Sequence, residues 1–266
     1  MALFFGGLFM GLLALLSVIF LEGGSIGALI VPSAILCAIL GPLGPSMMGI
    51  EKADVKKVPK TLKIALTGKA PDPDEVVTLF GRFAERARKE GMLALESELP
   101  NVTDHFMRTG LQLVVDGVDG DHVREVLEAE LEAVRDRHGA MIKFWGSMSG
   151  FAPIFGLMGT ILGIIGVMGK LAEPEELGPG IAVALVGVFM GVLWGNLIYL
   201  PIANKLTRLH ELEMEVRHLA LEGVMAVREG MSARLLVERL EAYLSPQMRV
   251  GHQKRSGRDA EKTAVA

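Results

Sequence analysis

The longest apolar region of this chain contains almost no side chain that could carry a charge. Between Trp145 and Ala203, no Asp, Glu, His, Lys or Arg occurs outside the short segment 170–176. A proton or cation relay inside a membrane needs a titratable or charged group. We therefore infer that this region cannot form a complete ion pathway alone. A second subunit must supply a carboxylate if it conducts, and the alternative is a passive membrane scaffold.

Side chains of the types that act as catalysts or metal ligands in enzymes are scattered along the chain. The single cysteine, Cys37, lies in an apolar stretch and has no partner for an internal disulfide. No phosphate-binding loop follows a predicted strand. The histidines show no metal-ligand spacing; they are His105, His122, His138, His210, His218 and His252. We expect no enzyme, no metal and no cofactor, and the net charge of −4 gives no indication of nucleic-acid binding.

Four apolar runs reach the length of about 20 residues that a membrane-spanning helix needs. They lie at residues 2–21, 26–50, 145–169 and 180–203. The sequence predicts an all-α membrane protein with four transmembrane helices, a helical cytoplasmic domain between spans two and three, and a C-terminal cytoplasmic helix. The predicted segments are a transmembrane hairpin at 1–50, the cytoplasmic domain at 51–144, a second hairpin at 145–203, the C-terminal helix at 204–244 and a disordered polar tail at 245–266.

Basic residues predict the orientation of these spans. Six lysines follow span two, and Lys205 and Arg208 follow span four, whereas the outer turns are mainly acidic. The six are Lys52, Lys56, Lys57, Lys60, Lys63 and Lys69. We expect a multi-pass protein of the bacterial inner membrane with both termini in the cytoplasm.

Helical patterns fill the predicted cytoplasmic parts. Asp72 and the acids after it are typical of a helix N-terminus, and apolar residues then recur from Val76 to Ala87 at helical spacing. Further helical runs cover residues 121–143 and 206–244.

Two features of the second hairpin indicate close packing and local weakness. Gly187, Gly191 and Gly195 repeat every four residues, which places them on one helix face where backbones can approach closely. Pro153 and Pro201 lie near the predicted cytoplasmic ends of spans three and four, and each removes a backbone donor. The glycines predict a tight bundle, a surface for partner helices, or both.

Four motifs in order resemble the MotA family of flagellar motor stator proteins, within the MotA/TolQ/ExbB superfamily. Residues 152–160 (APIFGLMGT) and 196–206 (NLIYLPIANKL) resemble its third and fourth spans. Residues 88–96 (RKEGMLALE) resemble its charged cytoplasmic stretch. Residues 230–234 (GMSAR) resemble the start of its C-terminal motif, although the usual Asn-Pro pair is absent.

This resemblance implies an ion-driven motor subunit. Five copies would surround two MotB-type partners, each supplying an ion-binding aspartate from its single span, and the ring would turn the rotor protein FliG. Pro153 and Pro201 match the prolines that link the channel to the cytoplasmic domain. Arg88 and Glu96 match the charges that contact FliG, with Arg86, Lys89 and Glu90 nearby as substitutes.

The prediction of the coupling ion depends on the residues at two positions. Thr160 and Val188 fall where sodium-driven relatives carry two threonines that line the pore, and here only one hydroxyl is present. Sodium needs several oxygen ligands, so a proton is favoured over sodium, although Thr160 is not typical of proton-driven relatives. Thr160 could also simply bond to its own helix backbone.

A TolQ/ExbB-type energiser of an envelope process is the main alternative. Those proteins usually have one span before the cytoplasmic segment, and the N-terminal hairpin predicted here argues against them. A passive scaffold or secretion anchor should tolerate loss of Pro153 and Pro201.

Overall fold

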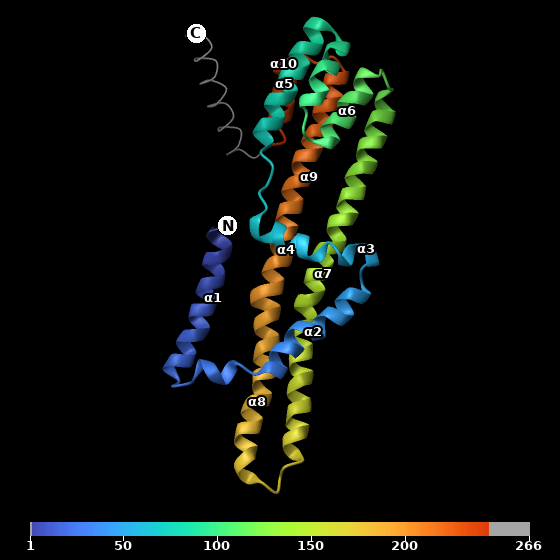
Figure 1. The fold of residues 1–266 in the computed structure, drawn as a ribbon. Helices are drawn as coiled ribbons and strands as arrows, with labels where there is room; N and C mark the ends of the chain where they lie inside the picture. Colours follow the sequence, from blue (N-terminus) through green and yellow to red (C-terminus); the bar gives the residue numbers. More distant parts are fainter. Residues whose placement is uncertain (1, 245–266) are drawn as a thin grey trace. The chain divides into compact units, whose positions relative to one another are not determined.

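The computed structural model describes residues 2–244, with side chains from residue 4 onward, and every regular element in this range is helical (Figure 1). The predicted polar tail at 245–266 lies outside the described residues. The chain forms two compact units, which we describe separately. Among the described residues, the first unit comprises 2–69 and 137–209, and the second comprises 70–136 and 210–244.

Three helices of the described chain are long and apolar enough to cross a membrane. They are α1 (Ala2–Leu21), α7 (Gly120–Met168) and α8 (Pro174–Leu193), the last continuing through a π-helical turn, η3 (Trp194–Tyr199), into α9 (Leu200–Arg228). The predicted second span contains a short 3-10 helix, η1 (Ile26–Leu29), and α2 (Pro32–Met48), an apolar helix of 17 residues. The predicted helix at 121–143 and the third apolar run form the single helix α7.

In the first unit, α7 and α8 run side by side and α2 packs against both (Figure 1). Gly41 of α2 lies under the ring of Phe155, and the Cys37 thiol donates a hydrogen bond to the Phe155 carbonyl oxygen at 3.1 Å. The lone cysteine therefore contributes to helix packing. Two short helices, α3 (Lys52–Val55) and α4 (Val58–Thr67), follow α2.

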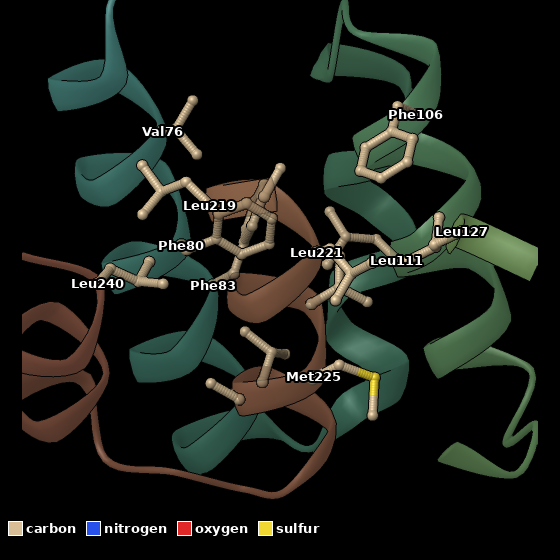
Figure 2. Packing of buried hydrophobic residues seen from close by; sticks show 14 of the residues in the cluster. Val76, Phe80, Phe83, Phe106, Leu111, Leu127, Leu219, Leu221, Met225 and Leu240 are labelled. Carbon is tan, nitrogen blue, oxygen red and sulfur yellow. The ribbon is translucent and has the colours of Figure 1, made fainter. Parts of the chain in front are cut away.

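The second unit has a continuous hydrophobic core built from α5 (Pro73–Glu90), η2 (Met92–Asn101), α6 (His105–Val115), α10 (Ala233–Glu241) and parts of α7 and α9. Figure 2 shows Phe80 and Phe83 of α5 facing Leu219 and Leu240. Asp72 accepts a hydrogen bond from the Asp74 amide at 3.0 Å, and the periodic apolar residues of α5 are buried. The predicted start and buried face of this helix are confirmed.

The prediction of one helix over residues 206–244 is wrong. The chain leaves the helical path after Arg228, and Gly230 adopts a left-handed φ of 69°. The Met231 amide donates to Ala226 at 3.1 Å and the Gly230 amide to Val227 at 3.0 Å, a pattern that ends helices at glycine. The reversal allows α10 to pack on α5.

Candidate functional site

Helices α7 and α8 touch backbone to backbone through glycine. A Cβ atom on Gly156 would lie 2.6 Å from the Gly187 carbonyl oxygen and 2.8 Å from the Gly191 Cα atom. A Cβ on Gly191 would lie 2.5 Å from the Ala152 carbonyl oxygen. Real Cβ atoms do not approach so closely, so the glycine spacing in span four serves the contact within this hairpin.

Other glycines of α7 have empty space around them in the single chain. A Cβ on Gly146, Gly150 or Gly166 would meet nothing within 4 Å. These positions leave the backbone of α7 open to close approach by a helix from another chain. The tight packing predicted from the glycines is confirmed for Gly156, Gly187 and Gly191, and the surface for partner helices stays a prediction.

The structure brings Thr160 and Val188 together. The contact joins the Thr160 hydroxyl to the Val188 backbone, and the Val188 side chain takes no part in it. Thr160 is buried, and its hydroxyl lies 2.7 Å from the Ala184 carbonyl oxygen, to which it donates, and 3.1 Å from that of Gly156. The Val188 amide donates to the same hydroxyl at 3.0 Å. Ala184 and Val188 are four residues apart, so the Thr160 hydroxyl bridges a donor and an acceptor that belong to one turn of α8.

This arrangement extends the prediction that Thr160 bonds to its own backbone. The contact with Gly156 is such a bond, one turn earlier in α7, and the other two contacts join α7 to α8. Three backbone groups surround the hydroxyl, and Val188 adds only an apolar side chain. The pair works as a polar clamp between the two helices.

Pro153 packs on the π-helical turn that leads to Pro201. A Cβ on Gly195, the second residue of η3, would lie 3.0 Å from Cδ of Pro153 and 2.9 Å from the Ser149 carbonyl oxygen. The turn ends at Tyr199, and Pro201 is the second residue of α9. Proline lacks an amide hydrogen and loosens a helix locally, and π-helical turns are frequent at functional sites. The structure therefore connects both predicted prolines through one irregular turn.

Aromatic side chains surround this turn. Trp145 of α7 lies with its ring centroid 6.2 Å from that of Tyr199, and Trp194 lies 6.0 Å from the same ring. The Trp145 indole N–H donates to the Thr61 hydroxyl of α4 at 3.0 Å, and this hydrogen bond is buried. Sequence analysis missed this contact because Thr61 and Trp145 are 84 residues apart. It ties α4 to the aromatic cluster beside η3.

Arg88 and Glu96 lie on either side of a sharp turn in the second unit. Arg88 is in the last turn of α5, Glu96 is in η2, and Gly91 between them has a φ of 87°. Both side chains belong to exposed residues. Within residues 2–244, the structure shows no ion pair for either one.

The charged neighbours of these two residues are engaged with one another. Arg86 forms ion pairs with Glu90, at 3.2 Å, and with Glu98, and Lys89 pairs with Glu85 at 2.7 Å. The hydrogen bond from Lys89 lowers the pKa of Glu85. Arg88 and Glu96 are thus the unpaired charges of the stretch 85–98, and they remain available for a partner.

No group of His, Cys, Asp or Glu residues in the described part of the chain could hold a metal ion. At the turn between α7 and α8, Lys170 pairs with Glu176 of the first turn of α8 at 2.7 Å. The hairpin itself consists of apolar contacts, glycine contacts and backbone hydrogen bonds. It can position helices around a charge carrier, and it contains no carrier of its own.

Comparison with known proteins places this hairpin in a family. The family model described as the MotA/TolQ/ExbB proton channel family matches residues 98–218. Motility protein A of Bacillus subtilis (strain 168) is 32% identical over 239 residues, covering 90% of this chain and 88% of that protein. Motility protein A of Treponema pallidum (strain Nichols) is 41% identical over 175 residues, covering 66% and 68%.

A solved structure supports the same assignment. The flagellar MotAB stator complex from Bacillus subtilis contains a chain that matches with a TM-score of 0.84 at 32% identity, covering 92% of this chain and 97% of that one. The fold and the family model thus define a helical protein with membrane-type helices that is similar to the MotA/TolQ/ExbB family. The chain belongs to the motility protein A family, as its four motifs predicted.

Proposed function

We propose that the chain is the channel-forming subunit of a flagellar stator and that it uses a proton gradient to generate torque on the rotor protein FliG. The similarity to a stator complex over 92% of the chain supports the stator function. The main observation behind the proposed mechanism is the hairpin of α7 and α8. Its two helices are closely packed, and no ionisable side chain lies between Trp145 and Met168 or between Gly180 and Tyr199.

The proposed topology has four spans in the bacterial inner membrane with both termini in the cytoplasm. Helix α2 alone has 17 residues, or about 26 Å at 1.5 Å per residue, against a hydrocarbon core of about 30 Å. The preceding 3-10 helix η1 adds about 8 Å at 2 Å per residue, which makes the segment long enough. The lysines after α2 place that end on the cytoplasmic side.

The proposed assembly is a ring of five copies around a dimer of a MotB-type partner. The partner span would supply the carboxylate that the hairpin lacks. Gly146, Gly150 and Gly166 have free space beside them and would allow a neighbouring helix to come close. Binding a proton on the partner would then shift the contacts at the turn η3, where Pro153 packs on Gly195 and which ends two residues before Pro201.

Protons are favoured over sodium because the one hydroxyl at the two predicted pore positions, that of Thr160, is already engaged by backbone groups. The Thr160 hydroxyl is surrounded by the backbone groups of Gly156, Ala184 and Val188. A dehydrated sodium ion needs several oxygen ligands, whereas a proton needs one carboxylate and a path through water. The Val188 side chain adds no oxygen.

A TolQ/ExbB-type energiser remains the second candidate because the family model over residues 98–218 covers both groups. The match to Bacillus subtilis motility protein A extends over 90% of the chain and therefore includes N-terminal residues outside that range. This wider match favours the stator.

Complementation tests the proposal. A flagellated strain that lacks its own stator would express this chain together with its cognate single-span partner. We expect swimming to be restored, and to be lost again when the partner's intramembrane aspartate is changed to asparagine. Correct membrane insertion of both chains without any swimming would reject the stator function, and rescue of an envelope defect instead would favour the energiser.

A further inference from the structure

Helix α4 has two unlike faces. Thr61 and Ala65 are buried, with exposures of 9% and 1%, against the cluster that contains Trp145 and Leu206. The opposite face carries Lys60 and Lys63, and Lys56 precedes the helix on the same side; all three residues are exposed. Helix α4 is thus held on the protein by one face and presents lysines on the other, and lysines close to an anionic membrane surface are attracted to it.

The lysines of this face are free, unlike their neighbour. Lys57 pairs with Asp54 at 2.6 Å, whereas Lys56, Lys60 and Lys63 have no acidic partner among residues 2–244. Three unpaired positive charges within eight residues would repel one another in the absence of counter-charges. An anionic neighbour would reduce this repulsion.

An exposed apolar side chain lies next to these charges on α4. Ile64, which directly follows Lys63, is 39% exposed. Apolar side chains next to lysines match a surface on which methylene groups enter the lipid and ammonium groups remain at headgroup level. A soluble anion would pair with the lysines and leave Ile64 in water, so a lipid fits both features.

We propose that Lys56, Lys60 and Lys63 form a binding surface for the phosphate headgroups of anionic phospholipids on the cytoplasmic side of the membrane. The buried hydrogen bond from Trp145 to Thr61 attaches this surface to α7, eight residues before Pro153. The inference rests on the proposed topology and is independent of torque generation.

Trp145 provides a reporter, because the chain has only two tryptophans. A Trp194→Phe variant would be reconstituted, with a partner subunit whose own tryptophans are replaced by phenylalanine, into mixtures of phosphatidylglycerol and phosphatidylcholine. One of the two lipids would carry bromine on its acyl chains, and fluorescence quenching would give its relative binding at the site. Co-purification of the Trp194→Phe variant with the partner subunit is compared with that of the unsubstituted chain, to show that the substitution leaves assembly intact.

We expect brominated phosphatidylglycerol to quench more strongly than brominated phosphatidylcholine. Each lysine near an anionic surface strengthens binding about fivefold, and the preference should weaken with added salt. Changing Lys56, Lys60 and Lys63 together to glutamine should bring the binding ratio close to one. A control that removes three charges from the second unit should retain the preference; it changes Arg82, Lys89 and Arg234 to glutamine.

Equal quenching by both lipids in the parent would overturn the proposal. So would a preference that survives in the triple lysine variant. Loss of subunit assembly in that variant without any lipid preference in the parent would assign the lysines to a protein contact. None of these readouts requires a working motor, so failure here is distinguishable from failure of the stator proposal.

Discussion

The contact between Gly163 of α7 and Ala184 of α8 allows a quantitative test of the hairpin. In a Gly163→Ala variant, the new Cβ would lie 2.9 Å from the Ala184 Cβ and 3.3 Å from its Cα. The helices must separate by about half an ångström, and overpacking of this kind costs about 1–3 kcal/mol. Replacing glycine by alanine in a helix returns up to about 1 kcal/mol. We expect a net loss of stability of up to about 2 kcal/mol.

The exchange of the two residues should restore the contact. A double variant with Gly163→Ala and Ala184→Gly has one methyl group at the crossing, as the parent has. Its opposite changes in helix propensity cancel. We expect its stability to lie within about 0.5 kcal/mol of the parent, and the two changes to be coupled by about 1–2 kcal/mol.

The assay is equilibrium unfolding in mixed micelles, followed by intrinsic fluorescence. Gly166 is the matched control because it lies in the same helix and a Cβ there meets nothing within 4 Å. Gly166→Ala combined with Ala184→Gly should be additive. A coupling below about 0.5 kcal/mol for the Gly163 pair, equal to that of the control, would refute the close packing of α7 on α8.

Other predictions concern the clamp, the prolines and the rotor face. Thr160→Val should lower stability by about 1–3 kcal/mol because backbone groups lose a buried partner, whereas Thr160→Ser should stay near the parent; equal values in unfolding would contradict the clamp. Pro153→Leu or Pro201→Leu should leave co-purification with the partner intact and abolish swimming, and unchanged swimming speed in both would reject their coupling role. Arg88→Glu with Glu96→Lys should reduce torque in tethered cells and leave assembly unchanged. The pairs of the neighbouring charges contribute only about 0–1 kcal/mol each, so retained torque would assign the rotor contact to Arg86, Lys89 and Glu90 or to another surface.

Local patterns in the sequence predicted much of the second unit. The start of α5 follows from Asp72 and Pro73, because a short acid accepts amide hydrogen bonds and proline fits the first helical turn. The spacing from Val76 to Ala87 predicted its buried face. The end of α9 at Gly230 was missed, although a glycine followed by serine is a recognisable stop and restart signal.

Contacts between distant segments could not be predicted in the same way. The hydrogen bond from Trp145 to Thr61 depends on how α4 folds back on α7, and no spacing in the sequence indicates it. The π-helical turn at 194–199 places Gly195 under Pro153, a contact that depends on the packing of α8 on α7. The sequence indicated Pro153, Pro201, Thr160 and Val188, and the structure adds the contacts of Pro153, Thr160 and Val188.

The glycines of the hairpin differ in what surrounds them, and the proposed mechanism depends on this difference. Gly156, Gly187 and Gly191 are used within one chain, so their substitution should affect the folding of the hairpin. Gly146 and Gly150 contact nothing within 4 Å in the single chain, so larger residues there should affect assembly first. A rigid hairpin with an open outer face is suited to move as a unit around a partner helix.

The most direct test of a proton-driven stator is the rotation speed of tethered cells that depend on this chain and its partner. Sodium is varied at a fixed proton-motive force. If protons drive rotation, the speed will be independent of sodium, and rotation will stop when a protonophore collapses the proton gradient. A speed that rises with sodium and persists in the protonophore would contradict a proton-driven mechanism and would assign a ligand role to the Thr160 hydroxyl.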